Sequence, residues 1–232
     1  MSSFENYAGG FAFDAPLEKR MDFLRKTYTH LLLAILAFVL CSIFFYKVGV
    51  GAAVLDFIAG NRYGWLMFLG GFMLVGWLAT AMSTLESRPA AYAGLLLYTV
   101  GEALIFSPLI TLAATVYTGV LPQATIVTLL TFAALTGYVF ITKQDFSFLR
   151  TALTVGAFVA LGLIVAGALF GFQLGLWFSA AMVLFACGAI LYSTSKVLHS
   201  YRTDQYVAAA LSLFASVALL FWYVLSLFMG RR

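Results

Sequence analysis

Residues 208–221 read Ala-Ala-Ala-Leu-Ser-Leu-Phe-Ala-Ser-Val-Ala-Leu-Leu-Phe, and this stretch decides the fold class. It is apolar on nearly every face, as is Leu31–Leu40, whereas a strand of a β-barrel would alternate apolar and polar residues. A helix rises about 1.5 Å per residue, so about 20 residues cross a hydrocarbon core of about 30 Å while the backbone satisfies its own hydrogen bonds. The stretch therefore predicts a membrane-spanning helix.

The rest of the chain repeats this pattern. Of its 232 residues, 63% are hydrophobic and 9% are charged, and the charges gather in short polar gaps between apolar runs. We predict an all-α polytopic membrane protein, a bundle of seven transmembrane helices with residues 1–27 as a cytoplasmic N-terminal tail and residues 28–230 as the transmembrane domain. The seven predicted spans are Thr29–Val50, Gly64–Ser83, Ala90–Tyr117, Leu121–Thr142, Thr151–Phe170, Leu174–Tyr192 and Val207–Met229.

The basic residues predict the orientation of these spans. Nine of the 13 Lys and Arg residues fall on the amino-terminal side and four on the other, so the positive-inside rule places the N-terminus in the cytoplasm and, for seven spans, the C-terminus outside. Arg231 and Arg232 lie on the wrong side for this rule. A re-entrant last segment, with both termini inside, is therefore the alternative.

Several function classes are excluded by composition. The net charge of +4 is explained by cytoplasmic loops that face anionic lipid headgroups, so we predict no nucleic-acid partner. Cys41 and Cys187 lie inside apolar spans without metal-ligand spacing, and the two His residues, His30 and His199, are far apart. Hydrolase, metalloprotease and phosphate-loop motifs are absent from the sequence, so we predict no enzyme, no metal and no cofactor.

Glu102 is an acidic residue midway through the third predicted span. A charged carboxylate near the bilayer centre costs at least about 2.5–3.5 kcal/mol, so Glu102 is predicted to face the bundle interior or a wet cavity, or to be protonated. Tyr98 shares its helix face, and Pro108 frees the carbonyl of Leu104. These residues form a candidate pathway for a cation or a proton. The alternative is a neutral Glu102 that hydrogen-bonds a neighbouring helix.

The loop at residues 142–150, Thr-Lys-Gln-Asp-Phe-Ser-Phe-Leu-Arg, is the second polar feature, on the predicted cytoplasmic side. Asp145 is placed to cap the helix that follows, and Lys143 lies beside it. A solvated connector is the alternative interpretation. Trp65 and other aromatic residues near span ends are predicted to be interfacial anchors.

Two segments carry a resemblance to a known family. They are residues 131–138, Thr-Phe-Ala-Ala-Leu-Thr-Gly-Tyr, which lead into the 142–149 loop, and residues 188–195, Gly-Ala-Ile-Leu-Tyr-Ser-Thr-Ser, before Leu198 and His199. Together with seven spans, these segments resemble the Bax inhibitor-1 family, and within it the bacterial YccA branch. The resemblance runs from about Arg25 to the C-terminus.

The resemblance implies an inner-membrane protein without enzymatic activity. Some members of the family are pH-sensitive calcium leak pathways, and the YccA branch modulates an FtsH-type membrane protease. The leaking members carry two aspartates where this chain has Ser193 and Ser216, and an arginine that latches them has its nearest counterpart in Arg88. The pair of carboxylates that would share a proton is thus missing.

Two hypotheses from different classes follow. The first is an interaction protein in membrane quality control or stress, a modulator or partner of an FtsH-type protease that presents its N-terminal tail to the cytoplasm. The second is a leak for calcium, another cation or protons, in which Glu102 takes over the electrostatic role of the lost aspartates.

Overall fold

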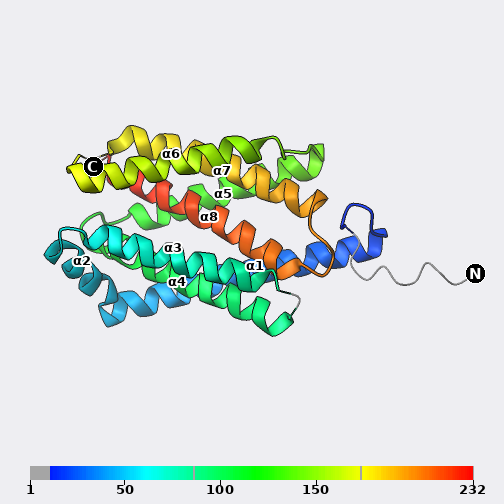
Figure 1. Ribbon diagram of the computed structural model, residues 1–232, viewed down its shortest axis with the longest axis horizontal. Coiled ribbons are helices and arrows are strands. Elements are labelled where there is room, and N and C mark those ends of the chain that lie inside the picture. Colours follow the sequence, from blue (N-terminus) through cyan, green and yellow to red (C-terminus); the bar gives the residue numbers. More distant parts are fainter. Residues whose placement is uncertain (1–10, 86, 173, 232) are drawn as a thin grey trace, which may run out of the picture.

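The computed structural model describes residues 11–85, 87–172 and 174–231 (Figure 1). Seven of the helices in this part of the chain are long and apolar enough to cross a membrane, which confirms the predicted all-α, polytopic architecture. The short helix α2 comes in addition, and its 11 residues span only about 16 Å, too little to cross. The helices are α1 (Leu17–Val48), α2 (Val50–Gly60), α3 (Gly64–Ser83), α4 (Arg88–Thr115), α5 (Val120–Thr142), α6 (Leu149–Phe170), α7 (Gly175–His199) and α8 (Tyr206–Met229).

Two of the helices extend by several residues beyond the apolar runs that predicted them. Helix α1 begins at Leu17 rather than Thr29, and α7 continues to His199 rather than ending at Tyr192. Hydropathy marks only the part of a helix that matches the hydrocarbon core, whereas the helical backbone continues into the polar region wherever hydrogen bonding and packing support it. The predicted bounds of α3 agree with the structure.

Gly49 separates α1 from α2. It adopts a left-handed backbone with φ 83°, which glycine tolerates best, and its N–H bonds to the carbonyls at the end of α1. Helix α2 then packs against α4, where Gly51 lies so close to Ser107 and Thr111 that a Cβ atom would clash. Helix α2 was not predicted from the sequence, because a short apolar segment after a span gives no periodic signal that distinguishes it from a loop.

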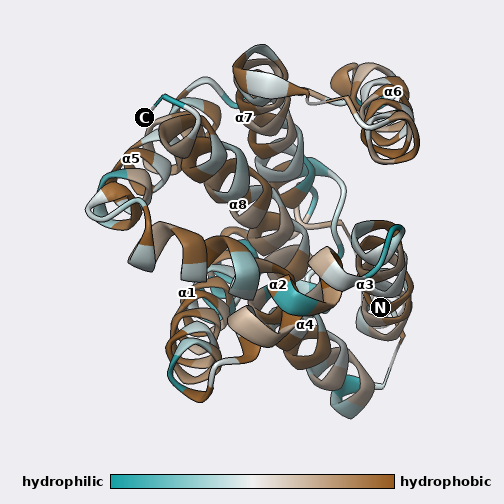
Figure 2. Ribbon diagram, turned by 90° about the vertical axis from the view of Figure 1, so that its left-hand side faces the viewer, coloured by the Kyte–Doolittle hydropathy of each residue, from teal (hydrophilic) through white to brown (hydrophobic). Residues whose placement is uncertain are grey.

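Helix α8 is the centre of the bundle, although it is the last in the chain. Figure 2 shows it among the other helices, with α6 at the periphery. In α8, 72% of the most apolar segment is buried inside the protein, against 11% in α6. Its run of Ala208, Ala209 and Ala210 is buried, and such small side chains let neighbouring helices approach closely. The helix runs unbroken from Tyr206 to Met229, without the interruption of a re-entrant segment.

The two ends of the bundle are distinguished here by the helices that begin at each. Helices α1, α4, α6 and α8 begin at one end, here called the N-side, and α3, α5 and α7 begin at the other, the far end (Figure 1). On the N-side the start of the described chain is tied to the α7–α8 connector. The N–H of Ala12 donates to the carbonyl of Tyr201 at 2.8 Å, and Phe11 pairs with Arg202 in an isolated β-bridge.

Candidate functional site

Glu102 lies in the middle of α4 and is only 6% exposed, which agrees with the predicted interior position. The phenol of Tyr98, one turn earlier on the same helix, donates a hydrogen bond to its carboxyl group. The structure thus brings together two of the three residues proposed for an ion pathway. A phenol is neutral, so Tyr98 satisfies a lone pair of the carboxylate but does not balance its charge.

A cavity of about 480 Å³ reaches Glu102 from the far end of the bundle, and we call it the Glu102 cavity. It lies between α3, α4, α6, α7 and α8. Trp65 at the start of α3 and Ser226 near the end of α8 line its outer part, so Trp65, which was predicted to be an interfacial anchor, also forms a wall of this cavity. The lining residues are Trp65, Leu69, Phe72, Glu102, Ile105, Phe106, Ile164, Gly167, Ala168, Phe172, Leu174, Phe178, Ser179, Ala218, Leu219, Trp222, Tyr223 and Ser226.

Pro108 does not leave an unpaired carbonyl beside Glu102, contrary to the expectation from sequence. Helix α4 continues through the proline, and the hydroxyl of Ser107 donates to the carbonyl of Leu104 at 2.8 Å. The side chain next to the proline therefore supplies the hydrogen bond that the missing N–H cannot. Pro108 is buried but does not line the Glu102 cavity.

Ser193 and Ser216, the two positions where the resemblance predicts aspartates in the family, touch each other across the α7–α8 contact. Their hydroxyl oxygens are 3.0 Å apart, and both residues are buried. Each hydroxyl also lies within hydrogen-bonding distance of a carbonyl of its own helix, Ala189 at 2.8 Å and Ser212 at 3.0 Å. The pair is neutral and internally satisfied. Arg88 lines a separate N-side cavity of about 380 Å³ with Arg202 and so does not latch this pair.

The loop between α5 and α6 is folded around Asp145. Its carboxylate accepts hydrogen bonds from the backbone N–H of Ser147 at 2.9 Å, from the Ser147 hydroxyl at 3.1 Å and from the Ser195 hydroxyl at 3.3 Å. These bonds, the backbone one foremost, hold the pKa of Asp145 below its ordinary value because they favour the ionised form. The N–H of Phe146 donates to Ser195 at 2.9 Å and ties the loop to α7.

This arrangement corrects the predicted role of Asp145 as a helix cap. Helix α6 starts after Phe148 without a side-chain hydrogen bond at its N-cap, and Asp145 instead closes a turn within the loop. Lys143 is exposed and ends α5 with a left-handed backbone, φ 51°. The loop is therefore a structured connection between α5, α6 and α7 rather than a freely solvated one.

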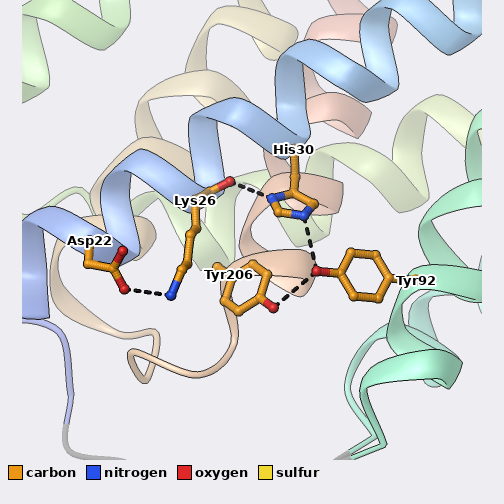
Figure 3. Close-up of polar contacts among 5 residues, drawn as sticks. All are labelled: Asp22, Lys26, His30, Tyr92 and Tyr206. Atoms are coloured by element: carbon orange, nitrogen blue, oxygen red, sulfur yellow. Dashed lines mark hydrogen bonds and ion pairs between the residues drawn. The ribbon is translucent and has the colours of Figure 1, made fainter.

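A polar cluster on the N-side joins three helices and was not found from sequence (Figure 3). His30 of α1 lies with Nε2 3.2 Å from the hydroxyl of Tyr92 of α4, which is 3.1 Å from the hydroxyl of Tyr206 of α8. Nδ1 of His30 is 2.6 Å from the carbonyl of Lys26, so this nitrogen donates. Only the pair of Asp22 and Lys26, four residues apart at 2.6 Å, leaves a local signal in the sequence.

Comparisons with known proteins agree with the resemblance seen in the sequence. The family model described as "Inhibitor of apoptosis-promoting Bax1" matches residues 20–232. The modulator of FtsH protease YccA from Escherichia coli is 37% identical over 101 residues, 43% of this chain and 46% of the relative. An uncharacterized protein from Pseudomonas aeruginosa is 38% identical over 112 residues, 47% of this chain and 49% of the relative.

A third relative matches over a longer range at lower identity. The Golgi anti-apoptotic protein of vaccinia virus is 29% identical over 233 aligned positions, which cover 96% of this chain and 90% of the viral protein. The chain therefore spans about half the length of the two bacterial relatives in these alignments and most of the viral one.

Proposed function

The chain belongs to the Bax inhibitor-1 family, and from this premise we propose that it is a non-enzymatic, multi-pass protein of the inner membrane that binds and modulates an FtsH-type membrane protease in quality control or stress. The observation that carries this proposal is the similarity to YccA, which is named as a modulator of FtsH protease. The alignment covers less than half of each chain, so the partner is a proposal for this protein.

The anchored start of the chain supports an N-side docking site for the protease. The proposed topology places the N-side in the cytoplasm, because nine of the 13 basic residues are assigned to it. The backbone bond between Ala12 and Tyr201 fixes the start of the described chain there, beside the α7–α8 connector. Phe13 adds a ring contact with His199 at 5.4 Å. Residues before this anchor are the proposed contact with the protease.

The test is to remove only the residues that precede the anchor. Deletion of residues 2–10 leaves Ala12 and the buried Phe23 of α1 in place, whereas a deletion through residue 27 would remove core packing as well. We expect the shortened protein to keep its melting temperature and to lose co-purification with the protease. A matched control replaces residues 2–10 by a Gly/Ser segment of equal length and should behave like the deletion. Unchanged binding in both variants would reject the tail as the docking segment.

A leak for protons, calcium or another cation through Glu102 is the second candidate function. The specific observation in its favour is the cavity that reaches this carboxyl group from the far end. Towards the N-side, the core residues Ala91 and Leu95 of α4 are buried against other helices, so a complete pathway requires movement there. The aspartate pair that the resemblance implies is replaced here by Ser193 and Ser216, so such a leak would depend on Glu102.

Flux into liposomes tests this second function. Calcium and proton uptake is measured from mildly acidic to mildly basic pH for the wild type and for Glu102→Gln, which keeps the shape of the side chain. We expect pH-dependent flux in the wild type and its loss in the variant. Flux that persists in Glu102→Gln would reject Glu102 as the conducting group, and absence of flux in both proteins would reject the leak itself.

A further inference from the structure

We propose that the Glu102 cavity is a binding site for an organic ammonium ion with an apolar body. Glu102 would hold the positive charge and the aromatic walls would hold the rest of the ligand. This inference goes beyond protease modulation, and it needs no passage of ions through the protein.

The inner end of the cavity holds one acidic side chain, Glu102. Glu102 is 6% exposed, and its hydrogen-bond donor Tyr98 is neutral. Among the described residues that line the cavity, none is Lys, Arg or His. A buried carboxylate is stable in its ionised form when a cation pairs with it, and a bound cationic ligand would supply the positive charge that the described lining lacks.

Aromatic side chains form much of the cavity wall. The indole ring of Trp222 lies 5.0 Å from the ring of Phe106, edge to face, and 6.2 Å from Trp65, nearly parallel at 26°. Phe178 and Tyr223 add a further pair at 6.0 Å on the α7–α8 side. Tryptophan is the best cation–π partner, and cages of aromatic rings are a recurrent way to bind alkylammonium groups.

The same wall does not provide a tight binding site for a bare metal ion, which a leak for that ion would not require. Calcium takes about six to eight oxygen ligands, and the cavity provides one carboxylate, with the hydroxyls of Ser179, Tyr223 and Ser226 as its other side-chain oxygens. Its volume of about 480 Å³ lies instead in the range of about 300–1,000 Å³ that small organic ligands occupy. Gly167 and Ala168 of α6 line this cavity with small side chains.

A matched pair of probes separates charge from shape. Benzyltrimethylammonium and its neutral isostere neopentylbenzene differ in one atom, nitrogen against carbon, and therefore in charge. Binding of each to the purified protein in lipid nanodiscs is measured at about pH 8, where a bound cation favours the ionised form of the carboxyl group. We expect saturable binding of the ammonium compound that is at least about tenfold tighter than that of the neutral compound, as expected for a charge-assisted contact.

Three variants with matched controls assign the binding to this cavity. Glu102→Gln should weaken ammonium binding about tenfold and leave the neutral compound unaffected, whereas Asp56→Asn, an exposed carboxylate on α2, should change neither. Trp222→Leu should weaken ammonium binding about threefold to tenfold, and Trp77→Leu, a residue 72% exposed on α3, should not. Ala168→Trp fills the cavity from the peripheral helix α6 with Glu102 intact and should abolish binding of both compounds.

Two results of these binding measurements would overturn the proposal. Equal binding of the two compounds, insensitive to Glu102→Gln, would show a merely apolar cavity and overturn the proposal. Displacement of the ammonium compound by calcium at constant ionic strength would show a site for inorganic cations and also overturn it. The measurement uses neither protease nor ion gradient, so its failure leaves the protease and leak tests unaffected.

Discussion

Two buried polar sites of this bundle, the Ser193–Ser216 contact and Glu102, are satisfied in opposite ways. The serine hydroxyls bond to each other at 3.0 Å and to carbonyls of their own helices. Glu102 has a phenol as its donor, and a cavity adjoins its carboxyl group. A pair of hydroxyls can be satisfied completely inside a helix contact, whereas a carboxyl group in its ionised form also needs a positive charge.

The difference separates a structural from a functional use of buried polarity. Where the resemblance predicts a pair of aspartates, this chain has a neutral contact between Ser193 and Ser216 that joins α7 to α8. Its buried acid lies elsewhere, on α4 beside a cavity. We call the Ser193–Ser216 contact the closed site and Glu102 with its cavity the open site. A charge placed in the closed site should lower the stability of the protein, and removal of the charge from the open site should raise it.

The largest effect is expected when a charge is placed in the closed site. Ser216→Asp puts a carboxylate opposite Ser193 without a cation in contact, and we expect a loss of about 3–5 kcal/mol in unfolding free energy. Ser216→Ala is the matched control and should lose only about 1 kcal/mol. Denaturant titration in detergent micelles measures both. An aspartate variant as stable as the alanine variant would show that water reaches this contact.

Removal of the negative charge of Glu102 should raise the unfolding free energy, whereas the added charge at Ser216 should lower it. Glu102→Gln keeps an acceptor for Tyr98, and at about pH 8 without ligand we expect the unfolding free energy to rise by about 1–2 kcal/mol, because an ionised side chain no longer lies inside the bilayer. Thermal unfolding followed by circular dichroism measures the change. A clear drop in melting temperature would mean that the carboxylate already has a stabilising partner within the protein.

The cluster of His30, Tyr92 and Tyr206 on the N-side should show a smaller change in unfolding free energy. Its hydroxyl groups carry no charge, and the cluster is partly exposed. Tyr92→Phe removes the hydroxyl that joins His30 to Tyr206 and should cost about 0.5–1 kcal/mol. The same change at Tyr63, an exposed residue at the far end, is the control and should cost less. Equal melting temperatures of both variants would show that the cluster adds no measurable stability.

The smallest effect is expected at Asp145, an exposed carboxylate satisfied by hydroxyl and amide donors. Its pKa is lowered in the folded protein, so the bonds that hold the loop are present above the ordinary value of about 3.9 and are lost as the pH falls through the lowered pKa. Cleavage of the loop by pepsin between about pH 5 and pH 2 should therefore increase on acidification in the wild type. In Asp145→Asn the extent of cleavage should vary less with pH, and an identical profile would contradict the assignment.

Part of the candidate site was accessible from sequence. An acid inside an apolar run must turn inwards, so the interior position of Glu102 followed from the cost of exposing it to lipid. The resemblance located Ser193 and Ser216 as equivalent positions of a pair, and the structure places them in contact. The hydrogen bond from Ser107 to the Leu104 carbonyl was missed, because a side chain adjacent to a proline can choose between several acceptors.

The sequence by itself determined the all-α membrane architecture, the seven spans and the presence of one acid among them, because each follows from the cost of placing polar groups in hydrocarbon. Tertiary structure alone decided that α8 lies at the centre, that α2 folds back onto α4, and that a cavity leads to Glu102. The physical reason is that lipid-facing and protein-facing residues are equally apolar in a membrane. Hydropathy therefore identifies what is in the bilayer, while the packing of side chains decides what lies next to what.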